Sequence, residues 1–191
     1  MSHYIDVINL KEKIFVLNNL ALSGESFSTS YCIGVSEHQK HYSDLDYHHF
    51  TKSLVSNYAI ELAVKLRNAS ELLQEGNIIF EKEKSIECYN VGNLAENFES
   101  KKHDFLYICD KIIHAKKFRI DTVGSKKYDA DFKWWNGDLT LSGTAPGKKK
   151  LPWEFFFSIK IWCESAIVFL NSNEKHFKLI NQQAEDRSVY S

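Results

Sequence analysis

The sequence lacks the long apolar runs and the paired cysteines that mark membrane proteins and disulfide-stabilised proteins. No apolar stretch approaches the roughly 20 residues that a membrane-spanning helix needs, and Lys160 and Glu164 interrupt the longest one. The four cysteines have no short paired spacing, and the N-terminus has no cationic segment followed by an apolar run. We therefore expect a soluble cytoplasmic protein with reduced thiols and no contact with a membrane.

Several sequence signatures of enzyme sites are missing too. The chain contains no phosphate-cradling glycine loop, nucleophile elbow, paired-cysteine zinc motif or dinucleotide fingerprint. Internal repeats and low-complexity tracts are also absent. We therefore predict no bound cofactor and no metal.

The composition is that of one globular domain. With 191 residues, 43% of them hydrophobic and 14% aromatic, the chain is long enough for one well-buried core and short for two. Charge is unevenly distributed along it: residues 1–100 hold 8 Lys and Arg against 14 Asp and Glu, whereas residues 101–150 hold 12 against 6. Such asymmetry favours an anionic partner for the basic segment, or self-association of the two parts, although uneven surface charge alone is about as common.

The hydrophobic pattern predicts a mainly α, α+β fold in a single domain, 1–191. Apolar residues recur at helical spacing in four segments, and two β-rich runs flank the turn pair Pro146-Gly147, which predicts a hairpin. Short strands are expected after Gly76 and at Phe118–Val123. The predicted helices cover about 4–22, 44–75, 98–117 and 159–171, and the hairpin covers about 138–158.

The predicted helix at 44–75 has two apolar sides. Ile60 and Val64 form the second side, which also contains Arg67 and Glu71, and we expect these two charged residues to form an intrahelical ion pair. A helix that is apolar on two sides is usually buried between neighbours or shared with a partner subunit.

The predicted helix at 98–117 carries the most informative pattern, with Asn97 or Ser100 as its cap. One broad side is apolar and faces a core, while the opposite side is a narrow polar stripe. The apolar side contains Phe105, Leu106, Ile108, Cys109, Ile112 and Ile113, and the stripe contains His103, Tyr107, Asp110, His114 and Lys117. A stripe of this kind is either a solvated face or a site.

Asp110 and His114 are one helical turn apart and could share a hydrogen bond, which would raise the imidazole pKa and fix its tautomer. That arrangement suits general acid or base catalysis, although it is also common on exposed helices. Cations close to the pair suit phosphate, and these are Lys111, Lys116, Lys117 and Arg119.

Two segments resemble the HEPN-domain family. The block CDKIIHA at Cys109–Ala115 resembles the family's signature helix, whose motif is an Arg, a following polar residue, and a His five positions after the Arg. The segment AIELAVKLRNASELL, at Ala59–Leu73, resembles a core helix of such domains. The resemblance implies a helical bundle, here with a β hairpin inserted before the last helix. It also implies a homodimer and a metal-independent ribonuclease of a bacterial toxin–antitoxin or defence-type system.

Carried over by position, His114 is the catalytic His and Asp110 is the polar residue, but Cys109 occupies the Arg position. A thiol cannot supply the charge that an Arg gives to phosphate. Arg67 substitutes for it only if the two helices bring it near His114. We therefore expect a degenerate module that binds RNA or a partner protein, with an active ribonuclease using His114 as the alternative.

A second alternative is a metal-dependent enzyme that uses the histidine-rich segment EHQKHYSDLDYHHF, His38 to His49. Neutral imidazoles with nearby carboxylates suit zinc, nickel or iron. The spacing fixes no geometry, and a polar loop leading into a helix is the simpler interpretation. The candidate ligands are His38, His41, Asp44, Asp46, His48 and His49.

Overall fold

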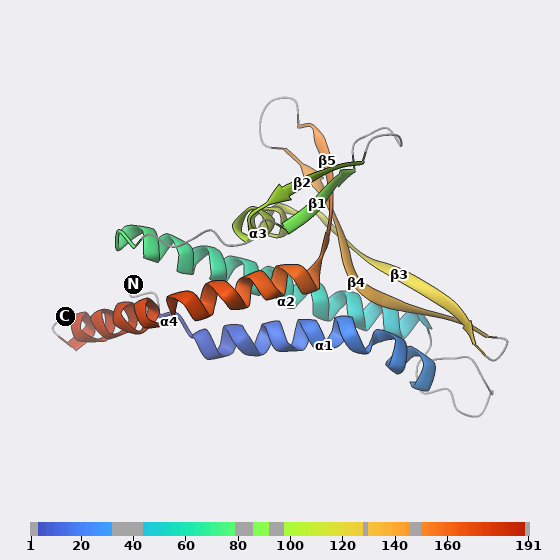
Figure 1. Cartoon of the computed structure of the whole chain (residues 1–191), viewed down its shortest axis with the longest axis horizontal. Helices are drawn as coiled ribbons and strands as arrows, with labels where there is room; N and C mark the ends of the chain where they lie inside the picture. Colours follow the sequence, from blue (N-terminus) through green and yellow to red (C-terminus); the bar gives the residue numbers. More distant parts are fainter. Residues whose placement is uncertain are drawn as a thin grey trace.

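Three long helices form the larger layer of the molecule. In the computed structural model, α1 (Val7–Tyr31), α2 (Asp44–Glu75) and α4 (Ile159–Val189) run side by side (Figure 1). The structure describes residues 4–31, 44–78, 86–91, 98–127, 130–145 and 150–189. Within these ranges the chain also forms a short helix and five strands, which are α3 (Phe105–His114), β1 (Ile86–Val91), β2 (Phe98–His103), β3 (Lys117–Lys127), β4 (Ala130–Thr144) and β5 (Pro152–Ser158). The described fold is therefore mainly helical and α+β, as predicted.

The described strands form one antiparallel sheet in the order β2-β1-β5-β4-β3. β4 and β5 pair from Asp138 with Ser158 to Thr144 with Pro152, which confirms the predicted hairpin, although its turn lies outside the described residues. β3 confirms the predicted strand at 118–123 and extends it to Lys127. The sheet is larger than expected, because β1 and β2 pair with each other and β1 joins β5.

The predicted end of the first helix, at about residue 22, was wrong, because α1 continues to Tyr31. Gly24 lies where α1 crosses β4, and a Cβ atom there would stand 2.6 Å from the carbonyl oxygen of Trp135 and 3.0 Å from the hydroxyl of Tyr47. The glycine therefore permits close packing of helix on strand and does not end the helix. The chain after α1, from 32 to 43, lies outside the described residues.

The last helix also extends beyond its predicted end at 171. Phe177 is fully buried and packs against Phe169, with ring centroids 5.9 Å apart. Further along, the Asn181 side chain accepts a hydrogen bond from the Ile5 N–H at 2.9 Å and donates one to the Ile5 carbonyl at 3.0 Å. These contacts tie the second half of α4 to the start of the chain, and the two ends lie at one end of the helical layer (Figure 1).

The predicted helix at 98–117 is shorter than expected. Residues 98–103 form β2 because β1 offers them a partner along six residues. Asp104, and neither Asn97 nor Ser100, caps α3, since its carboxylate accepts the Tyr107 N–H at 2.8 Å. At the other end, the Lys116 N–H bonds to the Ser142 carbonyl at 2.8 Å, which turns the chain into β3.

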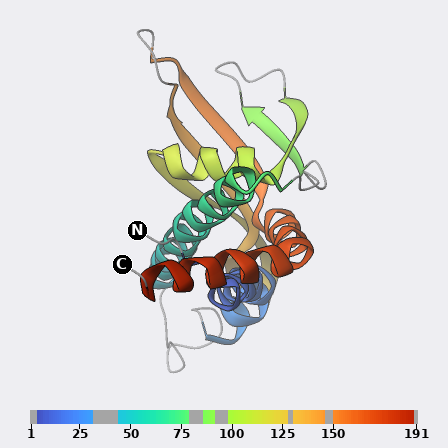
Figure 2. The ribbon, with the colours of Figure 1, turned by 90° about the vertical axis from the view of Figure 1, so that its left-hand side faces the viewer.

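α3 lies against α2 on the helical side of the sheet (Figure 2). Its predicted apolar side is confirmed, because Phe105, Ile108, Cys109 and Ile112 are buried. The indole N–H of Trp162, in α4, donates to the Phe105 carbonyl at 3.3 Å. The opposite side of α3 therefore remains available to solvent.

α2 has the predicted bounds, 44–75. The predicted ion pair between Arg67 and Glu71 is confirmed, with 3.1 Å between Nε and Oε1. Ile60 and Val64 are 40% and 38% exposed, so the second apolar side of α2 is not buried between neighbouring elements of the chain. Among the described residues, no helix combines the length and the apolar character that crossing a membrane requires.

Candidate functional site

A cleft of about 590 Å³ lies between the outer side of α3 and the ends of β4 and β5. We call it the α3–hairpin cleft. Its walls contain cations, one imidazole, one carboxylate and two aromatic rings. The lining residues are Tyr107, Asp110, Lys111, His114, Lys116, Thr144, Ala145, Lys150 and Trp153.

The α3 wall is the polar stripe predicted from the sequence. Tyr107, Asp110 and His114 follow one another at intervals of three and four residues, so they share one side of the helix. Asp110 and His114 are exposed, and Tyr107 is partly exposed. His103 is partly exposed and stacks on Tyr107, with centroids 3.9 Å apart and planes 9° apart, so it supports the wall from behind.

Lys111 lies between the two aromatic rings of the cleft. Its Nζ stands 5.1 Å from the ring centroid of Tyr107 and 4.6 Å from that of Trp153. Cation–π contacts of this kind stabilise by about 0.5–1 kcal/mol at exposed sites. They favour a position of the ammonium group near both rings.

The hairpin wall depends on a glycine. Gly143 pairs with Trp153 across β4 and β5, and a Cβ at position 143 would stand 2.4 Å from Cζ2 of that indole. The indole therefore lies over the backbone of β4, where any larger residue would displace it. At the hairpin's end, Lys150 has a φ of 41°, and the Ala145 N–H bonds to the Leu151 carbonyl at 2.8 Å.

The structure brings Asp110 to Arg67 rather than to a hydrogen bond with His114. The distance from Arg67 Nη1 to Asp110 Oδ1 is 2.9 Å, and in the described part of the chain no hydrogen bond joins Asp110 to His114. Arg67 reaches α3 from α2 but does not line the cleft. The expected carboxylate–imidazole pair is therefore replaced by a carboxylate–guanidinium pair at the cleft's edge.

The position equivalent to the motif Arg faces the core. Cys109 is fully buried, and burial raises the pKa of its thiol far above its usual range. Its side chain lies with that of Ile108 on the buried, apolar side of α3, whereas Asp110 is exposed. The Cys109 side chain therefore does not line the cleft.

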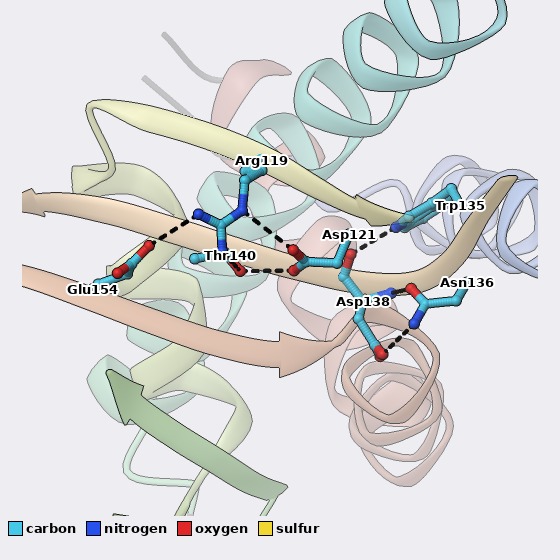
Figure 3. Close-up of polar contacts among 7 residues, drawn as sticks. All are labelled: Arg119, Asp121, Trp135, Asn136, Asp138, Thr140 and Glu154. Carbon is cyan, nitrogen blue, oxygen red and sulfur yellow. Dashed lines mark hydrogen bonds and ion pairs between the residues drawn. The ribbon is translucent and has the colours of Figure 1, made fainter. Parts of the chain in front are cut away.

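The four cations expected near His114 separate into two groups. Lys111 and Lys116 line the cleft, whereas Lys117 and Arg119 lie on β3 outside it. Arg119 bonds to Asp121 at 3.2 Å, to Glu154 at 3.3 Å and to the Thr140 hydroxyl at 3.1 Å (Figure 3). Its charge is therefore balanced by two carboxylates of the sheet.

Sequence reasoning missed Lys150 and Trp153 as parts of this site. Both lie in the segment predicted as a hairpin, and the run of three lysines before Leu151 was visible. Helical periodicity locates residues on one helix only. It contains no information on which strand end lies opposite α3.

The histidine-rich segment is only partly described. His38 and His41 lie outside the described residues, while His48 and His49 belong to α2. Within the ranges that the structure covers, no group of three or more His, Cys, Asp or Glu side chains is placed to hold a metal ion.

Comparisons of this chain with protein-family models, with curated proteins and with solved structures find no match.

Proposed function

We propose that the α3–hairpin cleft binds RNA without cleaving it, as a degenerate HEPN-like module of a bacterial toxin or defence-type system. The observation that supports this most is the charge of the cleft. Lys111, Lys116 and Lys150 line it together with His114, while its carboxylate, Asp110, is paired with Arg67. The cleft therefore has a surplus of positive charge that suits phosphate.

The backbone at Lys150 also supports a binding role. A φ of 41° is uncommon for a residue other than glycine, asparagine or aspartate, and such conformations gather at functional sites. A lysine at this position brings an ammonium group to the mouth of the cleft, opposite α3. A glycine there would relieve the backbone but remove the charge.

Binding without cleavage follows from what the cleft offers to a scissile phosphate. His114 is the imidazole that lines it, and Asp110, which could have oriented that imidazole, is held by Arg67. The motif position that would supply a guanidinium is Cys109, inside the core. General acid–base catalysis needs a positioned acid and base, and phosphoryl transfer needs positive charge fixed at the phosphate. The cleft offers His114 without a carboxylate that orients it, so we expect binding without cleavage.

Fluorescence anisotropy of a labelled RNA at several salt concentrations tests this function. Affinity should fall steeply with salt, because each lysine–phosphate contact releases counterions. Lys116→Gln and Lys150→Gln should each reduce the slope of log affinity against log salt by roughly 0.7. Arg119→Gln and Lys175→Gln are matched controls outside the cleft, and both should leave the slope unchanged.

A metal-independent endoribonuclease is the second candidate function, because His114 is exposed in the cleft beside Lys111 and Lys116. The same RNA, incubated with wild-type protein in chelator, should remain intact. Cleavage that persists in chelator and disappears in His114→Ala would replace the proposed function with this one. RNA binding that is absent, or insensitive to salt, would contradict both.

A further inference from the structure

We propose that the α3–hairpin cleft recognises an unpaired base, stacked on the indole of Trp153, so that its ligand is single-stranded RNA. This inference rests on the proposed function and specifies its substrate class. It assigns base contact to Trp153 and phosphate contact to Lys111, Lys116 and Lys150. The two kinds of contact can be tested separately.

Gly143 allows Trp153 to lie where it lines the cleft. The indole packs against Gly143, where the absence of a Cβ atom leaves room for its ring atoms. Trp153 is partly exposed and lines the cleft, whereas its neighbours on the same side of β5, Phe155 and Phe157, are fully buried. The first aromatic on this side of β5, Trp153, is therefore the one that lines the cleft.

An aromatic ring and an ammonium group surround the indole in the cleft. Tyr107 lines the same cleft from α3, and its ring contacts His103 and Phe155, with centroids 3.9 Å and 5.8 Å away. Between Tyr107 and Trp153 stands the ammonium group of Lys111. A phosphate in the cleft attracts this ammonium more strongly than a ring does, so ligand entry draws Lys111 away from the indole and opens its face to a base.

Stacking on an indole favours single-stranded RNA over a duplex. In a duplex each base is already stacked between its neighbours, and its faces are not accessible to a side chain. An unpaired base can leave its neighbours and stack on an aromatic ring, which is how proteins commonly bind single-stranded RNA. A volume of about 590 Å³ lies within the range of pockets that hold small organic ligands, and a nucleotide is such a ligand.

Three labelled probes of equal length test this: a single-stranded RNA, the same RNA in a duplex, and a single strand whose central nucleotides lack bases. Wild-type protein should bind the first about tenfold more tightly than the other two, given the usual strength of base–aromatic stacking. Trp153→Leu should lose that preference and leave affinity for the abasic probe unchanged. Trp153→Phe should retain most of the preference.

Gly143→Ala tests the orientation of the indole without changing its chemistry. The new Cβ displaces the ring, so this variant should behave as Trp153→Leu does, while Lys150→Gln should weaken all three probes. Should Gly143→Ala fail to fold, the two Trp153 variants carry the test alone. Equal affinity of wild-type protein for the three probes, with no effect of Trp153→Leu, overturns the stacking proposal and leaves the proposed function standing. Failure of every probe to bind overturns both.

Discussion

Cys109 and Asp110 are neighbours in the sequence that face opposite environments. The thiol is buried among the apolar residues of α3, and the carboxylate is exposed and meets Arg67 of α2. An Arg placed at 109 would point into the core, where an unpaired charge is very costly. The short spacing that resembles the HEPN motif therefore does not place both motif positions on the accessible side of this helix.

Arg119 shows the same dependence on neighbours. From the sequence it counts as one of four cations available to phosphate, yet in the structure it bonds to Asp121, Glu154 and Thr140. Ion pairs between strands join residues that are distant in the chain, here 35 positions apart. A local pattern predicts that Arg119 lies in a strand, but it could not have shown that Arg119 pairs with Glu154 or that Lys116 lines the cleft.

The Asp138 carboxyl should make the free energy of unfolding depend on pH. β4 forms a bulge at residues 136–138, opposite Asp121 of β3, and the Asn136 amide bonds to the Asp138 carboxylate at 2.7 Å (Figure 3). Burial raises the pKa of this carboxyl above its usual value of 3.8. The folded state therefore holds a proton more tightly than the unfolded state, so the stability that this group contributes is greatest at low pH and is lost as pH rises through the folded pKa.

Asp138→Asn removes that titration. The free energy of unfolding, measured with urea from about pH 3.5 to pH 7, should fall for the wild type relative to the variant as pH rises above about 4, and the difference should then level off. Other carboxylates titrate in both proteins and cancel in the difference. A difference that stays constant, or that grows in favour of the wild type, would show that burial does not control this carboxyl.

At the scale of elements, the sequence predicted which helices and strands exist better than it predicted where they begin and end. All four helices that the structure describes were expected, and α2 has its predicted bounds. The errors are at α1, α3 and α4, where contacts between distant segments decide the length of the helix. Gly24 is read as a stop signal unless β4 is known to cross it, and residues 98–103 are read as helix unless β1 is known to pair with them.

Gly24→Ala tests the crossing of α1 and β4. Alanine favours a helix interior over glycine by about 1 kcal/mol, yet the new Cβ would stand 2.6 Å from a backbone oxygen, which cannot move alone. Overpacking of this kind costs about 1–3 kcal/mol, so we expect the variant to be less stable in urea unfolding. Gly76→Ala is the control, because the nearest atom to its Cβ is 3.4 Å away, and it should change stability by less than about 0.5 kcal/mol. A gain in stability in Gly24→Ala would contradict the close crossing.

At the scale of the whole molecule, the fold redistributes the charge asymmetry of the chain. Residues 101–150 hold twice as many cations as anions. The fold brings Lys111, Lys116 and Lys150 to the cleft, whereas Lys117 and Arg119 lie on β3 outside it. The basic segment could be predicted from the sequence, but the cleft could not, because one wall comes from α3 and the other from a hairpin about 35 residues later.

Lysine footprinting with an acetylating reagent and mass spectrometry tests the central claim, that RNA occupies the α3–hairpin cleft. The protein is labelled alone and with saturating single-stranded RNA at low salt. We predict protection of Lys111, Lys116 and Lys150, with unchanged labelling of Lys52, Lys175 and Lys178, which are exposed on α2 and α4. Unchanged labelling of the three cleft lysines in the presence of bound RNA would contradict the account.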